Sequence, residues 1–404
     1  MTIPEDNIQL AMLGGDAAVR HDFSAQIAPT DAEIEAVTAI AASGQWWMGK
    51  KGHPAIRKLE ASMAQSQGTS YALGVTNGTQ ALEIILRNLG VGTGDQVIIP
   101  AYAPQSVAMV VQILGAEPVL VDVCLGTMTL DPEALSERIT PQVKAIIYVH
   151  LSGVVGAIDP VLSIAKAYDL PVVEDCRHAY GVKSKGRPVG SLGIAGAFDF
   201  QSGQMVSGGE GGVIVTQDKN LYGRCWSQHN CGRRQGRPRS EYYELGSNCR
   251  LAAFQAALIQ AQCQCWSEEL PQVLKNLDQI DACLAAIEGL TPQYRATKDQ
   301  SPTWRYLFRY ESHAFQGLPI TLFIKALQAE GVPCEGSPYR GLHQILQSRD
   351  SQASFPVAER LAQTVVGIPY SIFLGAEAPI QEIGEAITKI QHYAQQLVQS
   401  SRDA

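Results

Sequence analysis

Short apolar runs alternate with segments of helical periodicity in the first half of the chain. Strands are predicted within 71–79 and at 96–100, 117–122, 145–150 and 171–175. This alternation is typical of a parallel sheet covered by helices on both faces, and it predicts an α/β fold. Ligands on such sheets bind beyond the carboxyl ends of the strands. Asp175, Gly78 and the turn at 197–213 fall at or just beyond such ends.

The outer parts of the chain differ from this strand–helix region. Thr30 and Glu33 have the spacing of a capping box, which predicts a helix start, and Gly44 predicts the end of that helix. Long helices are predicted from 251 to about 290, and the amphipathic stretch 379–398 predicts a C-terminal helix. The predicted organisation is an N-terminal arm (1–30), a large α/β domain (31–290) and a small C-terminal α+β domain (291–404).

Composition argues against several classes of partner. The 404 residues are 46% hydrophobic and 17% charged with a net charge of −8, and the pI is near 5.5. This balance gives no reason to expect nucleic acid or an anionic membrane as a partner. Without a leader-like start or an apolar run long enough to span a bilayer, a cytoplasmic protein is expected. The nine cysteines are scattered and never spaced Cys-x-x-Cys, so reduced thiols and no metal site are expected.

The most informative stretch is 197–213, Ala-Phe-Asp-Phe-Gln-Ser-Gly-Gln-Met-Val-Ser-Gly-Gly-Glu-Gly-Gly-Val. It resembles the active-site strand and turn of the DegT/DnrJ/EryC1/StrS aminotransferases, which read roughly Phe-Ser-Phe-x-x-x-Lys-x-x-x-x-Gly-Glu-Gly-Gly. In that family the lysine forms the Schiff base with pyridoxal phosphate (PLP). Here Gln204 stands at the lysine position and Asp199 at the serine position.

The resemblance covers nearly the whole chain, because further family blocks follow in order at 43–47, 75–83, 94–102, 139–147, 173–181, 190–193 and 246–250. The blocks at 44–47, 200–203 and 229–233 are most similar to the 3-amino-5-hydroxybenzoate synthases and the glutamine:scyllo-inosose aminotransferases. The resemblance implies the PLP-transferase fold type I, with a mainly parallel seven-stranded sheet in the large domain. It also implies a homodimer with shared active sites, and a setting in antibiotic or other secondary metabolism.

Part of the family's cofactor site is retained. The resemblance implies that Asp175 pairs with the pyridinium nitrogen of PLP and that His178 contacts its ring. It implies that Gly78 and Thr79 form the backbone cradle for the phosphate. Asn248 matches the asparagine that reaches this phosphate from the second subunit.

Other parts of that site are lost. Gln204 can neither form an imine nor carry a proton, because an amide nitrogen is not nucleophilic and does not titrate near neutrality. A carboxylate at Asp199, about 4 Å from the phosphate, repels it by about 1 kcal/mol per charge pair in water and by more when partly buried. Pro104 stands where the family places a stacking aromatic. Arg177 replaces a small residue and is expected to pair with Asp175 or Asp199.

These changes predict a protein that has abandoned the cofactor, and three hypotheses stay open. The first is a PLP-independent enzyme for dehydration, cyclisation or lyase chemistry on an aminosugar-, aminocyclitol- or aminobenzoate-like metabolite. Its candidate catalytic residues are Asp175, Arg177, His178, Asp199, Gln204 and Glu210. The second is a non-catalytic pseudo-aminotransferase, as a homodimer or as a heterodimer with a competent paralogue. The third is an enzyme that uses PLP or pyridoxamine phosphate (PMP) with its lysine naturally or artificially replaced.

Candidate substrate-binding residues are less specific. Trp46 and Trp47 follow the first helix, where tryptophans suit a substrate pocket and an arm or dimer surface equally. Tyr102 follows a predicted strand. Arg233 and Arg250 flank an arginine-rich segment that also holds arginines 234, 237 and 239. Such a segment is either a solvated loop or an anion-binding or intersubunit loop.

Overall fold

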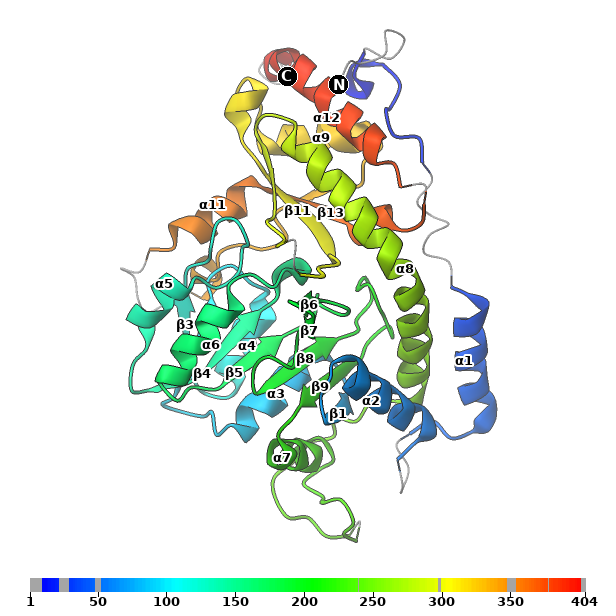
Figure 1. Cartoon of the computed structure of the whole chain (residues 1–404), viewed down its shortest axis with the longest axis vertical. Coiled ribbons are helices and arrows are strands. Elements are labelled where there is room, and N and C mark those ends of the chain that lie inside the picture. Colours follow the sequence, from blue (N-terminus) through cyan, green and yellow to red (C-terminus); the bar gives the residue numbers. More distant parts are fainter. Residues whose placement is uncertain are drawn as a thin grey trace.

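A computed structural model describes residues 9–21, 29–47, 52–238, 240–296, 299–346, 354–376 and 378–400 (Figure 1). The helices are α1 (Asp31–Ser43), α2 (Pro54–Ser66), α3 (Gly78–Asn88), α4 (Gln105–Ile113), α5 (Pro132–Leu135), α6 (Ile158–Ala167), α7 (Lys219–His229), α8 (Ala253–Ala285), α9 (Ile320–Ala329), α10 (Leu342–Leu346), α11 (Pro356–Thr364) and α12 (Ile380–Ser400). Among these described helices, none combines the length and the apolar character that crossing a membrane requires.

A seven-stranded sheet forms the larger layer, in the order β1-β9-β8-β5-β4-β2-β3. Its strands are β1 (Tyr71–Val75), β2 (Gln96–Pro100), β3 (Glu117–Val121), β4 (Val143–Val149), β5 (Val172–Asp175), β8 (Ala195–Asp199) and β9 (Gly212–Thr216). All neighbouring strands run parallel except at β9, which pairs antiparallel with β1 and β8. The predicted α/β fold with a mainly parallel seven-stranded sheet is therefore confirmed.

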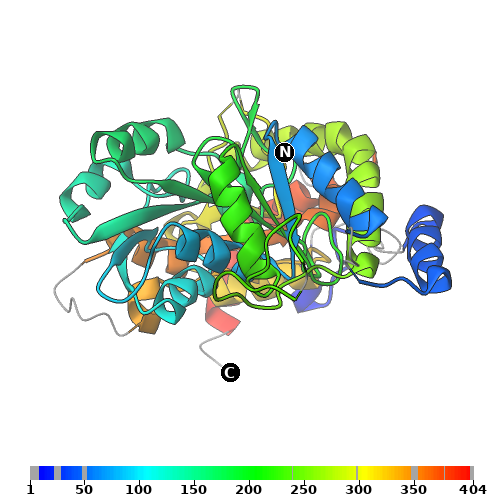
Figure 2. The ribbon, with the colours of Figure 1, turned by 90° about the horizontal axis from the view of Figure 1, so that it is seen from below.

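Alternate side chains of each strand pack on opposite faces of this sheet. Val97 and Ile99 of β2 join the buried cluster that includes α3, α4 and α7. Ile98 between them joins the cluster of α2, α6 and α8 on the other face. Both faces are apolar because helices cover both, as is usual for parallel sheets. Figure 2 shows this layer of strands with helices on its two sides.

A four-stranded antiparallel sheet lies above the larger one in the view of Figure 1. Its order is β10-β11-β13-β12, from β10 (Leu290–Pro292), β11 (Arg305–Tyr310), β12 (Glu335–Gly336) and β13 (Val365–Pro369). A two-stranded ribbon, β6 (Lys183–Ser184) with β7 (Arg187–Pro188), completes the described strands.

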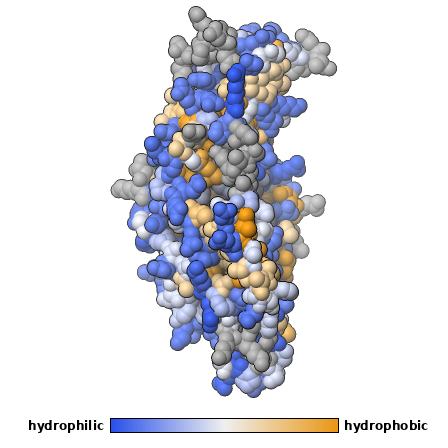
Figure 3. Space-filling view, turned by 90° about the vertical axis from the view of Figure 1, so that its right-hand side faces the viewer, coloured by the Kyte–Doolittle hydropathy of each residue, from blue (hydrophilic) through white to orange (hydrophobic). Residues whose placement is uncertain are grey.

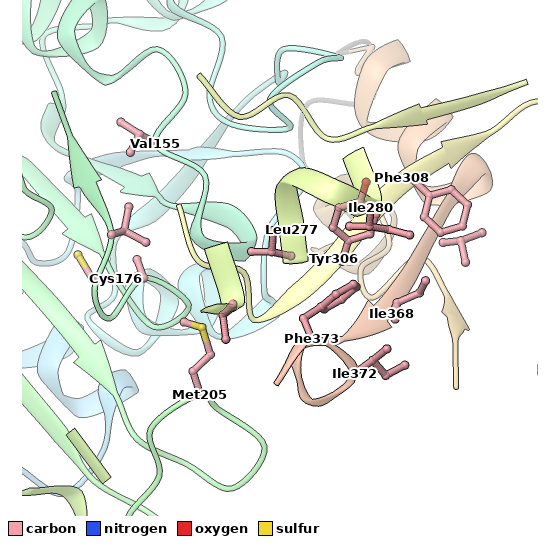
Figure 4. Packing of buried hydrophobic residues seen from close by; sticks show 14 of the residues in the cluster. Val155, Cys176, Met205, Leu277, Ile280, Tyr306, Phe308, Ile368, Ile372 and Phe373 are labelled. Carbon is pink, nitrogen blue, oxygen red and sulfur yellow. The ribbon is translucent and has the colours of Figure 1, made fainter. Parts of the chain in front are cut away.

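Helix α8 connects the two sheets. Its first half packs in the cluster under the large sheet, and its second half packs on the small one, where Leu277 and Ile280 lie beside Tyr306 and Phe308 (Figure 4). The buried amide of Asn276 donates to the carbonyl oxygens of Phe373 and Gly375 at 2.9 and 2.8 Å. Because α8 packs on both sheets, it does not mark a clear break between two domains. The domain boundary at residue 290 therefore stays a prediction.

Several local predictions can be compared with the structure. The capping box is confirmed, since Thr30 and Glu33 exchange both hydrogen bonds and Gly44 ends α1 with φ +64°. The predicted C-terminal helix is α12. The long helices expected from 251 are a single helix that continues through Pro271. On the side where α1 and α8 lie, hydrophobic residues form separate patches among polar ones (Figure 3).

Candidate functional site

Two strands of the large sheet end, and one helix begins, at the same place. Strand β5 ends at Asp175, strand β8 ends at Asp199, and helix α3 begins at Gly78. β5 and β8 are parallel neighbours with Asp175 opposite Ala197, so both carboxylates lie at the same edge of the sheet. Arg177 and His178 follow Asp175 directly. The topology therefore brings together motif residues as much as 121 positions apart in the sequence.

Arg177 forms a buried ion pair with Asp175. Its Nε donates to Oδ1 and Oδ2 of Asp175 at 3.0 and 2.8 Å, and its Nη1 donates to Ser106 Oγ at 2.6 Å. Nη2 lies 2.8 Å from Oδ2 but is too poorly aligned for a hydrogen bond. Burial lowers the pKa of Arg177, but the attraction of Asp175 and Asp199 outweighs it and the net pKa is raised. The pairing predicted for Arg177 is thus confirmed, with Asp175 as its partner.

Asp199 places a carboxylate at the start of helix α3. The backbone N–H of Gly78 donates to its Oδ1 at 3.0 Å, and a helix N-terminus with free N–H groups is an anion site. Burial raises the pKa of Asp199, while the hydrogen bond from Gly78 and the charge of Arg177 oppose the rise. A Cβ added to Gly78 would lie 2.5 Å from the Cβ of Asp199, so the two residues pack without a gap.

His178 lies in a stack of side chains from the small sheet. Its ring is parallel to the indole of Trp304, with centroids 4.2 Å apart and an interplanar angle of 4°. Its Nε2 is 3.4 Å from the hydroxyl of Tyr339. Burial lowers the pKa of His178 well below its ordinary value, and the charges of Arg177 and Arg305 lower it further. The imidazole is therefore neutral at physiological pH.

Gln204 is buried in the turn that follows β8. Its side-chain Oε1 and Nε2 have no hydrogen-bond partner in the part of the chain that the structure describes. The turn itself is tied to the small sheet, because Trp304 Nε1 donates to the carbonyl oxygen of Gly203 at 2.8 Å. One indole thus contacts both His178 and the residue before Gln204.

The residues present do not fit pyridoxal phosphate. The cofactor needs an anion site for its phosphate, a carboxylate for its ring nitrogen and an amine for its aldehyde. Asp199 takes the anion site at Gly78, and Arg177 takes the carboxylate of Asp175. Gln204 offers an amide, which is not nucleophilic. None of the three requirements is therefore met: the anion site and the carboxylate are already occupied, and the amine is replaced by an amide.

Other predicted site residues lie at the border of this centre. Tyr102 is buried beyond β2, and its hydroxyl is 2.6 Å from Ser337 Oγ. Pro104 is buried at the start of α4, two residues before the Ser106 that Arg177 contacts. Glu210 is exposed, and its charge contributes to the raised pKa of Asp199. The catalytic and binding roles of these residues stay predictions.

The remaining predicted binding residues lie elsewhere. Trp46 and Trp47 are half-exposed beside the start of α8, where the carbonyl oxygen of Trp46 accepts from Ala253 N at 3.0 Å. Thr79 is half-buried in the first turn of α3. Asn248 is exposed and forms an isolated antiparallel β-bridge with Asn230.

The two predicted binding arginines belong to the segment that follows α7. Arg250 Nη1 donates to Asn230 Oδ1 at 3.1 Å. Arg233 stacks on Tyr242 with its guanidinium carbon 4.7 Å from the ring centroid. Arg239 of the same segment lies outside the described residues.

Sequence reasoning missed the contribution of the small sheet. Trp304 precedes β11, and Ser337 and Tyr339 follow β12, yet all three contact residues at the centre. No motif marks these positions. The only signal is that a tryptophan and a tyrosine stand in polar turns at strand ends, which is too common to single them out.

A second buried cluster lies beside the site, at His150, Glu174 and Cys176. Their potential ligand atoms lie within 4.8 Å of one another. The Glu174 carboxylate accepts from the N–H groups of Gly190, Leu192 and Gly193, each at 2.7 Å, and lies 2.9 Å from His150 Nε2. Burial raises the pKa of Cys176 well above its ordinary value, so its thiol stays protonated. The Glu174 carboxylate is thus engaged by the 190–193 turn and by His150.

Comparison with known proteins gives consistent results. The profile of the DegT/DnrJ/EryC1/StrS aminotransferase family matches residues 28–388. A 3-amino-5-hydroxybenzoate synthase of Amycolatopsis mediterranei is 36% identical over 265 residues, 65% of this chain and 68% of that protein. An L-glutamine:2-deoxy-scyllo-inosose aminotransferase of Streptoalloteichus tenebrarius is 30% identical over 95% of this chain and 97% of its own. The crystal structure of a 3-amino-5-hydroxybenzoic acid synthase superposes with a TM-score of 0.83 at 28% identity, covering 93% of this chain and 99% of the other.

Proposed function

The chain belongs to the DegT/DnrJ/EryC1/StrS aminotransferase family, and we propose that it is a member that works without pyridoxal phosphate. The observation that carries the proposal is that side chains of the chain itself pair with Asp175 and Gly78, the two residues to which the family resemblance assigns the ring nitrogen and the phosphate of the cofactor. Arg177 forms an ion pair with Asp175, where the resemblance implies the pyridinium. Asp199 accepts a hydrogen bond from Gly78, where the resemblance implies the phosphate. Arg177 has the same sign of charge as a pyridinium and Asp199 the same sign as a phosphate, so each offers the group that it contacts a partner of the kind a cofactor would supply.

The chemistry that we assign to the site is proton transfer by residues of the chain. Neutral His178 can accept a proton at Nδ1, and burial raises the pKa of Tyr339, so its phenol stays protonated 3.4 Å from His178 Nε2. This imidazole and phenol are the pair of groups that we assign to proton transfer in dehydration, cyclisation or elimination. The named activities of the relatives support an aminocyclitol-, aminosugar- or aminobenzoate-like substrate in secondary metabolism.

The assembly that we propose is a cytoplasmic homodimer, as the family resemblance implies. A second candidate function, a non-catalytic partner subunit, is favoured by the exposure of Asn248 on the segment after α7. In that case this chain lends Asn248 to the site of a competent paralogue. Thermal stabilisation by a small metabolite in the absence of any other subunit supports the enzyme over the partner subunit.

The test is the near-ultraviolet and visible spectrum of the purified protein, recorded before and after addition of excess PLP and then PMP, with calorimetry alongside. We expect no cofactor band in the isolated protein and no heat of binding for either compound. A bound-cofactor band, or binding in the micromolar range, contradicts the proposal. It would instead support a PLP- or PMP-dependent enzyme in which glutamine at position 204 replaces the family's lysine.

A further inference from the structure

Residues 337–341, which we call the strap, connect the small sheet to the helices of the large one. The strap follows β12 and precedes α10, whose first residue, Leu342, donates its N–H to the carbonyl oxygen of Ala101 at 2.8 Å. The strap itself is half-buried, and its Arg340 is exposed. Through Tyr339, whose hydroxyl is 3.4 Å from His178 Nε2, it covers a side chain that is only 2% exposed.

A short chain of hydrogen bonds ties the strap to the end of β2. Ser337 Oγ donates its single proton to the carbonyl oxygen of Tyr339 at 2.7 Å. The Tyr102 hydroxyl lies 2.6 Å from the same Oγ and is therefore the donor in that contact. Burial raises the pKa of Tyr102 above its ordinary value, so this hydroxyl keeps its proton. Tyr102 thus holds the backbone of Tyr339 in place through Ser337.

The two aromatic side chains that cover His178 differ in how firmly they are held. Trp304 stacks on the imidazole with centroids 4.2 Å apart, and its Nε1 donates to the carbonyl oxygen of Gly203 at 2.8 Å. Tyr339 is farther away, with ring centroids 6.4 Å from those of His178, and its contact with Nε2 at 3.4 Å is long for a hydrogen bond. Tyr339 is therefore the cover that moves more easily.

We propose that Tyr102 and Ser337 are positioning residues that hold the strap closed, and that a ligand reaches His178 when their hydrogen bond breaks and Tyr339 moves away. This inference rests on the proposed function, because it concerns access to the imidazole to which we assign proton transfer. A closed cover excludes water from the imidazole, and its opening admits and releases small molecules. Loss of one net hydrogen bond raises the fraction of open molecules about fivefold.

The test is modification of the histidines by diethyl pyrocarbonate at neutral pH, with the rate at each histidine followed by peptide mass spectrometry. The reagent attacks neutral imidazole that solvent reaches, so the rate at His178 reports how often the strap opens. His150 is 0% exposed and contacts Glu174, so it reports general unfolding. His392 is exposed and reports the strength of the reagent.

Four variants separate the hydrogen bond from other effects. Tyr102→Phe and Ser337→Ala remove it, whereas Ser337→Thr keeps the hydroxyl. Tyr310→Phe is the matched control, because Tyr310 also donates from a buried hydroxyl, to the carbonyl oxygen of Leu318 at 2.8 Å, but packs in the core of the small sheet. We expect His178 to react at least about fivefold faster in Tyr102→Phe and Ser337→Ala, and within about twofold of the wild-type rate in the other two.

Three results overturn the inference: His178 reacts as fast as His392 in the wild type, Tyr102→Phe leaves the rate at His178 unchanged, or His150 accelerates together with His178. The last result would show that the variant unfolds rather than opens the strap. The labelling requires neither cofactor nor ligand, so the two proposals fail separately. A cofactor band in the spectrum refutes the proposed function whatever the rates, and an unchanged rate at His178 refutes only the role of the strap.

Discussion

Arg177 and Asp199 determine what the centre of this protein can hold. Each differs from the family motif at a single position, and each places a charge against a residue that the family resemblance assigns to the cofactor. A buried ion pair such as Arg177–Asp175 contributes little net stability, but removing one partner leaves an uncompensated charge at a penalty of about 3–5 kcal/mol. The three substitutions at 177, 199 and 204 therefore have to be considered as one coupled unit.

We predict that Gln204→Lys alone does not restore a cofactor site. The new amine would face a centre in which Asp175 remains paired with Arg177 and the α3 start remains bound to Asp199. The triple variant Gln204→Lys, Asp199→Ser, Arg177→Ala removes both obstacles and is expected to gain an imine absorbance band with added PLP. The measurement is the spectrum of each variant with PLP, before and after borohydride reduction. An imine band in the single variant would show that the centre is not remodelled.

At the scale of the element, strand β5 carries two adjacent carboxylates with different tasks. Asp175 faces the site, whereas Glu174 points to the other face of the sheet and binds the 190–193 turn through three backbone N–H groups. Alternation along a strand makes this division unavoidable. Glu174 thus anchors β5 to the 190–193 turn next to the position of Asp175.

We predict that Glu174→Ala destabilises the protein by about 3–5 kcal/mol, because three backbone N–H groups, at least one of them buried, and the buried His150 lose their partner. Glu174→Gln keeps an acceptor oxygen and should lose less. Glu117→Ala is the control, since Glu117 is exposed on β3 and should change stability by less than about 0.5 kcal/mol. Urea unfolding at neutral pH gives the three values. Equal midpoints for Glu174→Ala and the control would refute this anchoring role.

The strands and the ion pair at the centre could be predicted from the sequence because each depends on residues that are close together in the chain. Asp175 and Arg177 are two positions apart at a strand end, and Thr30 and Glu33 are three apart at a helix start, so spacing alone brings their atoms together. Trp304 and Tyr339 could not be predicted in this way. Their contacts with His178 depend on how the small sheet packs on the large one, which no local pattern encodes.

At the scale of the whole molecule, the buried centre contrasts with an exposed segment that is rich in aromatic residues. The centre is closed because the small sheet supplies Trp304 and Tyr339 to it. The segment after α7 is different: Leu245 is 97% exposed and Tyr242 is 61% exposed, while Arg233 and Arg234 stack on Tyr242 and Tyr243. Tyrosine and arginine are the residues that most often dominate protein interfaces. The stacking orders these side chains in advance and lowers the entropy lost when a partner binds.

We predict that this segment is a contact between two copies of the chain, and that Tyr242→Ala with Leu245→Asp weakens the dimer at least tenfold. Tyr168→Ala is the control, because Tyr168 is comparably exposed at the end of α6 and outside the segment. Sedimentation equilibrium over a wide concentration range gives the dissociation constants. A monomeric wild type, or a double variant that dimerises like the control, contradicts the prediction. A dimer through this segment would also cover Asn248, which is exposed beside Cys249 in the single chain, and so explain why the family's asparagine is retained on the surface.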